Sequence, residues 1–329
     1  MVAASVRSDV PGDRYLAKHL GPGPGGTPDP NTLRDIAAMK AAVLGHGDVL
    51  VLHDRETGEK AARFTTIGVR AQERAALADG AAVAGARHHR GVATRHQEAA
   101  LASRTLREDQ RAAFEHAVSA GGLKIIEGRA GTGKSFTLAA VRDAHERAGD
   151  RVVGLAPTNA VAQDLKADGF REAGTVHAAL FAIKNGRGPG WDKRTVLVVD
   201  EAAMLDSRVT GELLAEARAS GAKVILAGDD RQLASIERGG LFAEMRKQHG
   251  AAEITEVTRQ TVGWQRQAAR DLAEGRFDAA VQAFDRHGAV TWTPDQELAR
   301  SALVERWKAD SAADPARQPI RIRLHQRRG

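Results

Sequence analysis

The sequence predicts an α/β fold, in which a parallel sheet is flanked by helices and preceded by a smaller mixed or helical domain. Two observations predict the sheet. Short apolar runs at residues 123–127, 152–156, 195–199 and 223–227 alternate with stretches of helical spacing. A glycine-rich turn also separates the first run from the helical pattern that follows it. Ligands of such sheets bind at the carboxyl ends of the strands.

The region before these runs is more weakly patterned. Residues 21–30 are rich in glycine and proline and predict a turn or linker. A helix is expected to begin near Asn31, which is a good cap residue. We expect a short strand over residues 48–52 and helices between residues 66 and 97.

Composition limits the classes of function. The 329 residues carry a net charge of +6, which favours a polyanionic partner without requiring one. There are no cysteines, which excludes a disulfide scaffold, a cysteine nucleophile and a cysteine-based zinc site. No apolar run is long enough to span a membrane, and charges interrupt the first part of the chain. We therefore expect a cytoplasmic protein with no membrane segment.

The turn after the first apolar run matches a phosphate-binding loop. Residues 128–135 fit the pattern G-x-x-x-x-G-K-[ST] between a strand and a helix. Glycines let the backbone amides face phosphates, and the amino end of the helix favours negative charge. Lys134 would neutralise the β- and γ-phosphates of ATP, and Ser135 would ligate Mg²⁺. The candidate nucleotide-binding residues of this segment are Gly128, Arg129, Ala130, Gly131, Thr132, Gly133, Lys134, Ser135 and Phe136.

An acidic pair follows the third apolar run. Asp200 would hold the Mg²⁺ shell, and Glu201 would orient or deprotonate the attacking water. An acidic pair at a strand end is by itself often a solvated helix cap. Together with the phosphate loop, it predicts an enzyme that binds ATP and hydrolyses it, with Lys134 and Glu201 as catalytic residues.

These motifs together resemble a known family. Residues 128–135, 200–204 and 228–233 are similar to motifs I, II and III of RecD-like superfamily 1 helicases. Residues 64–292 resemble the helicase portion of Ti-type conjugative transfer relaxases, the TraA proteins. The resemblance implies a P-loop NTPase (RecA-like) sheet, DNA-dependent ATP hydrolysis with Mg²⁺ and movement from 5′ to 3′. It also implies single-stranded DNA and other conjugative-transfer proteins as partners.

The resemblance implies roles for further residues. Gln110 would read the adenine edge from a Q motif at residues 106–110. Gln232 of motif III would sense the γ-phosphate, and Arg259 of motif IV would touch it. The implied single-strand path is lined by Pro157, Thr158, Asn159, Thr175 and His177.

Without the family, each of these residues has a plainer interpretation. Gln110 and Arg259 would be surface residues, and Thr158 and Asn159 would cap a helix. His177 would be a core histidine with its hydrogen bonds satisfied.

The resemblance divides the chain into three parts. These are an accessory domain over residues 1–100, a RecA-like ATPase lobe over residues 101–260, and an incomplete second lobe over residues 261–329 that ends in a basic tail. The family's motifs V and VI would lie beyond Trp292. We therefore expect a truncated motor with slow turnover and no unwinding, since the second lobe supplies an arginine finger.

Other functions remain open or are disfavoured. Relaxase activity is set aside, because Tyr15 is the only tyrosine and no His-x-His lies near it. The histidines at 88, 89 and 96 are expected to be solvated. One alternative is a nucleotide-bound DNA-binding or interaction module with negligible turnover. A P-loop kinase or GTPase is disfavoured, because the guanine-specifying N-K-x-D is missing.

Overall fold

The structure is a computed structural model that describes residues 6–7, 38, 41–53, 60–129, 131–229, 241–256, 262–273 and 275–313. The chain divides into two compact units, residues 1–259 and 260–329. Each unit is described by itself.

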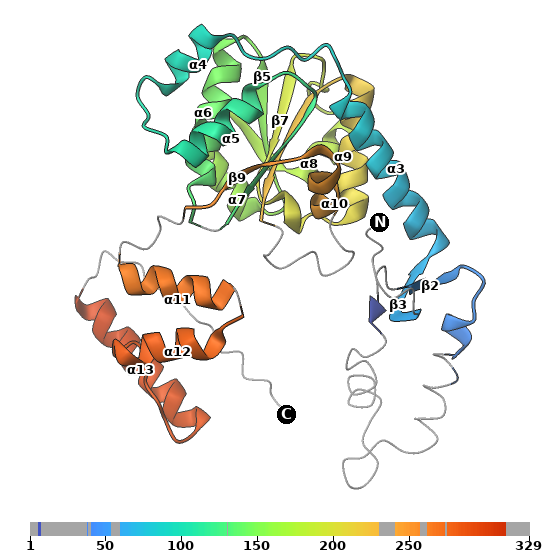
Figure 1. The fold of residues 1–329 in the computed structure, drawn as a ribbon. Helices are drawn as coiled ribbons and strands as arrows, with labels where there is room; N and C mark the ends of the chain where they lie inside the picture. Colours follow the sequence, from blue (N-terminus) through green and yellow to red (C-terminus); the bar gives the residue numbers. More distant parts are fainter. Residues whose placement is uncertain are drawn as a thin grey trace. The chain divides into compact units, whose positions relative to one another are not determined.

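The first unit is built on a six-stranded sheet in which all pairings are parallel. The strand order is β6-β5-β7-β8-β4-β9 (Figure 1). The strands are β4 (Leu123–Gly128), β5 (Arg151–Ala156), β6 (Glu172–Thr175), β7 (Thr195–Val199), β8 (Lys223–Gly228) and β9 (Ala252–Ile254). The four apolar runs are β4, β5, β7 and β8, which confirms the predicted α/β sheet. The edge strands β6 and β9 were not predicted.

Helices cover both faces of the sheet. Side chains alternate along a strand, so Val196 and Val198 of β7 enter one core while Leu197 and Val199 enter the other. The first core is closed by α4 (Thr94–Leu101), α5 (Glu108–Val118), α6 (Lys134–Arg147) and α7 (Asn159–Ala167). The second is closed by α3 (Ile67–Ala84), α8 (Val176–Lys184), η1 (Ala202–Met204), α9 (Ser207–Ser220) and α10 (Phe242–His249).

Helices α3 and α9 pack closely because small residues line their contact. A Cβ at Gly211 would lie 3.2 Å from the Cβ of Ala76, so the two backbones approach with nothing between them. An ion pair of 2.7 Å between Arg218 and Asp79 flanks the same contact. This packing attaches α3 to the sheet.

A second, smaller sheet precedes α3. It contains β1 (Val6–Arg7), β2 (Val49–His53) and β3 (Lys60–Thr66) in the order β1-β3-β2. Both of its pairings are antiparallel. The strand expected near residue 50 is β2, and the helices expected between residues 66 and 97 are α3 and the start of α4. The predicted helix start at Asn31 lies outside the described residues.

The described part of the second unit is helical. It consists of α11 (Gly263–Ala273), α12 (Phe277–Arg286) and α13 (Gln296–Ala313). Trp264 holds α11 against α12, because its ring stacks on His287 at 4.0 Å and meets Phe284 edge-on at 5.5 Å. Across the described ranges of both units, no helix has the length and apolar character that crossing a membrane requires.

Candidate nucleoside triphosphate site

The loop between β4 and α6 has the backbone of a phosphate cradle. Gly131 and Gly133 adopt left-handed φ angles of 78° and 80°, which glycine tolerates without strain. A Cβ at Gly128 would lie 2.8 Å from the Cγ of Lys134, so this glycine is needed for the lysine stem to fold over the strand end. The Thr132 hydroxyl closes the loop by donating to the carbonyl of Arg129 at 2.8 Å.

Lys134 and Glu201 bring the two sequence motifs together. The Lys134 side chain is only 7% exposed, and its Nζ lies 3.4 Å from Oε1 of Glu201. The second carboxylate oxygen of Glu201, Oε2, is buried and has no hydrogen-bond partner among the described residues. An ammonium and an incompletely satisfied carboxylate therefore face each other at the carboxyl ends of β4 and β7, as a site for phosphates and a divalent cation requires.

Asp200 is the buried member of the acidic pair. Burial raises its pKa to about 6, and the neighbouring Lys134 opposes this rise while Glu201 adds to it. Its Oδ1 accepts the backbone N–H of Glu201 at 2.9 Å. A buried carboxylate of this kind gains from a cation beside it, so Asp200 fits the role of a Mg²⁺-shell residue. Ser135, the other predicted metal residue, is exposed at the start of α6.

Gln110 lies against the phosphate loop rather than on the surface. Its side chain is 3% exposed, and its Nε2 donates to the carbonyls of Thr132 and Gly133 at 3.2 and 3.5 Å. Its Oε1 accepts the backbone N–H of Arg107 at 3.2 Å. Each polar atom of the amide thus has a partner in the chain, and contact with adenine stays a prediction.

The predicted DNA-binding residues lie at the carboxyl ends of two neighbouring strands. Thr158 and Thr175 cap α7 and α8, accepting the N–H of Val161 at 3.4 Å and of Ala178 at 3.1 Å. Both cap roles are therefore real, and they leave DNA contact open. The remaining three are Pro157, which is half-buried, and Asn159 and His177, which are exposed.

The outer residues of the predicted site are only partly described. Arg129 is half-buried within the loop, and Phe136 is exposed on the first turn of α6. Ala130, Gln232 and Arg259 lie outside the described residues. Asp229, three residues before the predicted sensor glutamine in the sequence, is buried at the end of β8.

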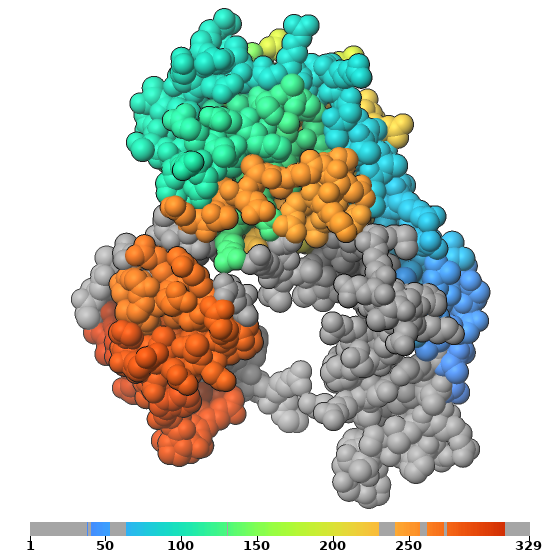
Figure 2. Space-filling view, viewed as in Figure 1, coloured from blue at the N-terminus to red at the C-terminus, as the bar shows by residue number. Residues whose placement is uncertain are grey.

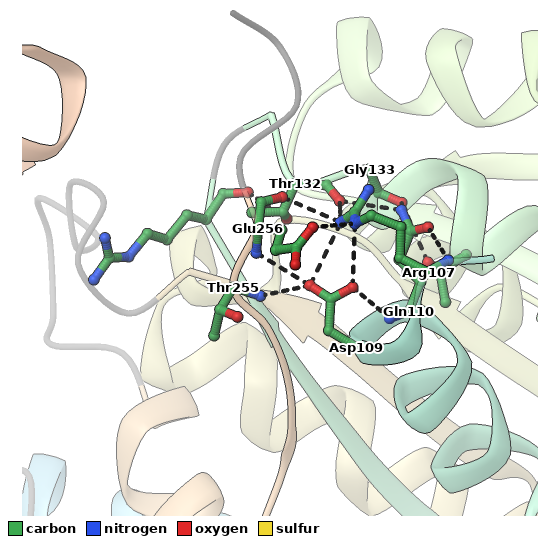
Figure 3. A network of polar contacts seen from close by, with 9 residues as sticks. Arg107, Asp109, Gln110, Thr132, Gly133, Thr255 and Glu256 are labelled. Carbon is green, nitrogen blue, oxygen red and sulfur yellow. Dashed lines mark hydrogen bonds and ion pairs between the residues drawn. The ribbon is translucent and has the colours of Figure 1, made fainter. Parts of the chain in front are cut away.

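The Q motif at residues 106–110 contains two further residues to which the sequence analysis gave no role. Arg107 donates to the carbonyl of Thr132 at 2.9 Å, and Asp109 lies 3.3 Å from Arg107 (Figure 3). Their place in the Q motif was one signal, and the helix-start position of Asp109 was another, since acidic residues favour the first turn of a helix. Their distant partners could not be read from spacing.

A parallel sheet whose strands end in a phosphate loop and in an acidic pair with one buried member defines the class of P-loop nucleoside triphosphatases. Comparison with known families agrees, because the AAA domain family matches residues 105–295. The chain belongs to this AAA domain family, which covers more than half of its length.

Individual proteins within this class are similar to the chain over much of its length. The conjugal transfer protein TraA of Rhizobium radiobacter is 33% identical over 259 residues, which is 78% of this chain and 23% of that protein. The ATP-dependent RecD2 DNA helicase of Deinococcus radiodurans is 32% identical over 208 residues, which is 60% of this chain and 28% of that protein. The resemblance to RecD-like helicases and to the helicase portion of TraA proteins, predicted from the motifs, is confirmed.

These relatives are much longer than the chain, which spans about a quarter of their length. Among solved structures, the Pif1 helicase from Candida albicans aligns over 58% of this chain and 49% of that chain, with 20% identity and a TM-score of 0.45. The fold assignment rests on the sheet itself.

Proposed function

We propose that this chain binds ATP with Mg²⁺ and hydrolyses it in response to single-stranded DNA, as the motor core of a conjugative-transfer helicase. The observation that carries the proposal is the meeting of Lys134 and Glu201 beside a loop with two left-handed glycines. By resemblance to the RecD-like helicases, the motor would move from 5′ to 3′ along DNA. Other conjugative-transfer proteins would be its partners.

The site residues divide the chemistry among them. Lys134 would leave Glu201 for the β- and γ-phosphates, where its charge offsets charge that develops during phosphoryl transfer. Glu201 would then be free to orient water for attack on the γ-phosphorus. Ser135 and Asp200 would hold Mg²⁺, which supplies electrostatic stabilisation of the phosphate oxygens. Gln232 and Arg259 stay candidates for sensing and touching the γ-phosphate.

We assign DNA contact to the ends of β5 and β6 and to the exposed face of α8. Charge supports this assignment, because residues 173–191 contain no Asp or Glu while the exposed face carries His177 and Lys184. Phe181 is 59% exposed on the same face, with the Arg187 guanidinium 6.0 Å from its ring centre. Proteins commonly bind single-stranded DNA through aromatic and cationic side chains together.

We further propose that residues 101–260 form the ATPase lobe, residues 1–100 an accessory domain and residues 261–329 part of a second lobe. The chain divides into its two compact units after residue 259, which supports the proposed boundary between the ATPase lobe and the second lobe.

ATP hydrolysis measured with and without single-stranded DNA tests the function. We expect DNA-stimulated hydrolysis that Lys134→Ala abolishes and that the matched surface variant Lys247→Ala keeps. Turnover that persists in Lys134→Ala would contradict the proposed site. ATP binding without any turnover, with DNA present, would instead make the chain a nucleotide-bound interaction module.

A further inference from the structure

One guanidinium group joins two distant segments of the first unit. Nη2 of Arg107, at the start of α5, donates to the carbonyl of Thr132 in the phosphate loop at 2.9 Å. The same nitrogen donates to the carbonyl of Glu256 at 3.1 Å, and Nε of Arg107 lies 3.2 Å from the Glu256 carboxylate. Figure 3 shows Arg107 between the loop and the segment that follows β9.

The Asp109 carboxylate accepts hydrogen bonds from the backbone of that segment. Its Oδ2 accepts the N–H groups of Thr255 and Glu256, both at 3.1 Å, and its Oδ1 accepts the N–H of Gln110 at 2.8 Å. Burial alone would raise the pKa of Asp109, but these backbone hydrogen bonds and Arg107 lower it below its usual value. The carboxylate is therefore ionised at neutral pH and accepts charge-assisted bonds.

The segment held in this way leads out of the first unit. Glu256 lies three residues before the end of that unit at Arg259. Among the strands that the structure describes, β9 pairs only with β4, and it has three residues, so the sheet itself gives the segment little support. Helix α5 packs alongside β9, and the orange segment that contains β9 adjoins the teal and green surface around α5 in Figure 2.

We propose that Arg107 and Asp109 are positioning residues that link the phosphate loop to the segment leaving the first unit, so that nucleotide at the loop changes the order of Thr255 and Glu256. The loop carbonyl of Thr132 moves with the loop that holds the phosphates. Because one Nη2 is shared between that carbonyl and the carbonyl of Glu256, displacement of the first alters the bond to the second. The nucleotide dependence rests on the proposed ATP binding, whereas the link itself does not.

Hydrogen exchange of the nucleotide-free protein tests the link. Arg107→Gln removes the guanidinium group that contacts both segments, and Arg111→Gln is a matched control on the exposed face of the same helix. We expect exchange in Arg107→Gln to rise by about tenfold in both residues 131–133 and residues 255–256, which corresponds to the loss of about one hydrogen bond. Arg111→Gln should match the wild type. A rise in only one of the two segments would overturn the link.

A second pair of variants guards against a folding defect. Asp109→Asn keeps the shape of the side chain and removes its charge, and Glu108→Gln is its exposed neighbour with the same change of charge. Asp109→Asn should raise exchange in residues 255–256, and Glu108→Gln should not. Equal exchange in both variants would contradict the role given to Asp109.

Adding the slowly hydrolysed analogue ATPγS with Mg²⁺ tests the nucleotide dependence. In the wild type we expect exchange at Thr255 and Glu256 to change on binding, and in Arg107→Gln we expect that change to be lost. Arg107→Lys should restore only part of it, because a lysine has no planar fork. A full change in Arg107→Gln would overturn the proposal. If the wild type fails to bind the analogue, the proposed function and the nucleotide dependence both fail, while the nucleotide-free comparison still decides the link.

Discussion

At the scale of single residues, Glu201, the residue proposed to orient the attacking water, carries backbone strain. Its φ of 50° makes it the one non-glycine residue with a positive φ in the ranges that the structure describes. The left-handed conformation costs a side-chain-bearing residue about 1–2 kcal/mol. Asp200 offsets this cost by accepting the Glu201 N–H, and Lys134 by pairing with its carboxylate. Strain held at a reactive position is common where a side chain must point in one direction.

Glu201→Gln should separate binding from turnover. The amide keeps the size of the side chain but cannot accept a proton, so we expect ATP turnover to fall by about 10²–10⁴-fold. Affinity for ATP should stay within a few-fold of the wild type, as measured by titration with a fluorescent ATP analogue. The exposed Glu115→Gln on α5 is the control and should behave as the wild type. Equal turnover in the two variants would remove Glu201 from the mechanism.

The expectation that His89 is solvated was wrong, because its side chain is buried, and this burial predicts that the protein loses stability in acid. Burial and then the neighbouring His88 lower its pKa from 6.5 to about 4, with Lys223 and Asp150 also facing it. The unfolded chain therefore binds a proton below pH 6.5 that the folded chain takes up only near pH 4. The contribution of neutral His89 to the free energy of unfolding is fully present above pH 6.5 and is lost progressively as the pH falls towards 4.

Urea unfolding at pH 7.5 and pH 5.0 measures this effect. His89→Gln should lose less free energy of unfolding on acidification than the wild type does, because it has no group to protonate there. His96→Gln, a variant on α4, should lose as much as the wild type. Equal losses in all three proteins would show that His89 does not carry the effect.

Residues were predictable where the signal is local. The phosphate loop is a contiguous pattern whose glycines are required by backbone geometry, so Gly131, Gly133 and Lys134 could be assigned from sequence. The contacts of Arg107 could not, because its partner carbonyls are main-chain atoms that any residue type supplies. Gln110 shows the same limit: the resemblance implied an adenine contact and the helical pattern alone a surface position, while its bonds to the phosphate loop appear only in the structure.

At the scale of elements, apolar continuity decided which strands could be predicted. All five residues of β7 are buried, so it reads as an unbroken apolar run. Strand β6 is half-exposed and contains glutamate and glycine, and β9 has only three residues. Both lie at the edges of the sheet, where one side of the strand has no neighbour and the burial that creates an apolar run is missing.

The contact between α3 and α9 predicts a stabilising substitution. A Cβ at Gly80 would meet Leu214 and Met245 at 3.6 Å, an ordinary packing distance. Gly80→Ala should therefore raise the free energy of unfolding by about 0.5–1 kcal/mol, since alanine favours the helix interior. Gly211→Ala is the matched variant on α9, where the new Cβ would lie 3.2 Å from Ala76 and part of the gain is lost. Chemical denaturation measures the free energy of unfolding of both variants, and we expect the larger gain in Gly80→Ala. A Gly211→Ala variant as stable as Gly80→Ala would contradict this prediction.

At the scale of the whole molecule, one edge of the sheet carries both candidate activities. The phosphate loop follows β4, the acidic pair follows β7, and the candidate DNA residues follow β5 and β6. Because all six strands are parallel, these groups share the carboxyl edge. Strand β7 lies between the DNA side and the nucleotide side, directly beside β5. A structural change at Glu201, which follows β7, is therefore only one strand away from the candidate DNA-binding residues that follow β5.

Salt dependence distinguishes the two kinds of DNA contact proposed on α8. Lys184→Gln removes a charge, so single-strand affinity should fall and the slope of log K against log salt should become shallower by about 0.7. Phe181→Ala removes a stacking surface, so affinity should fall by about 1–3 kcal/mol with the slope unchanged. Lys247→Gln lies on α10, on the β4–β9 side of the sheet, and should alter neither quantity. Fluorescence anisotropy of a labelled oligonucleotide at several salt concentrations measures both. If Phe181→Ala shifts the slope, or Lys247→Gln weakens binding as much as Lys184→Gln, DNA does not bind this face as proposed.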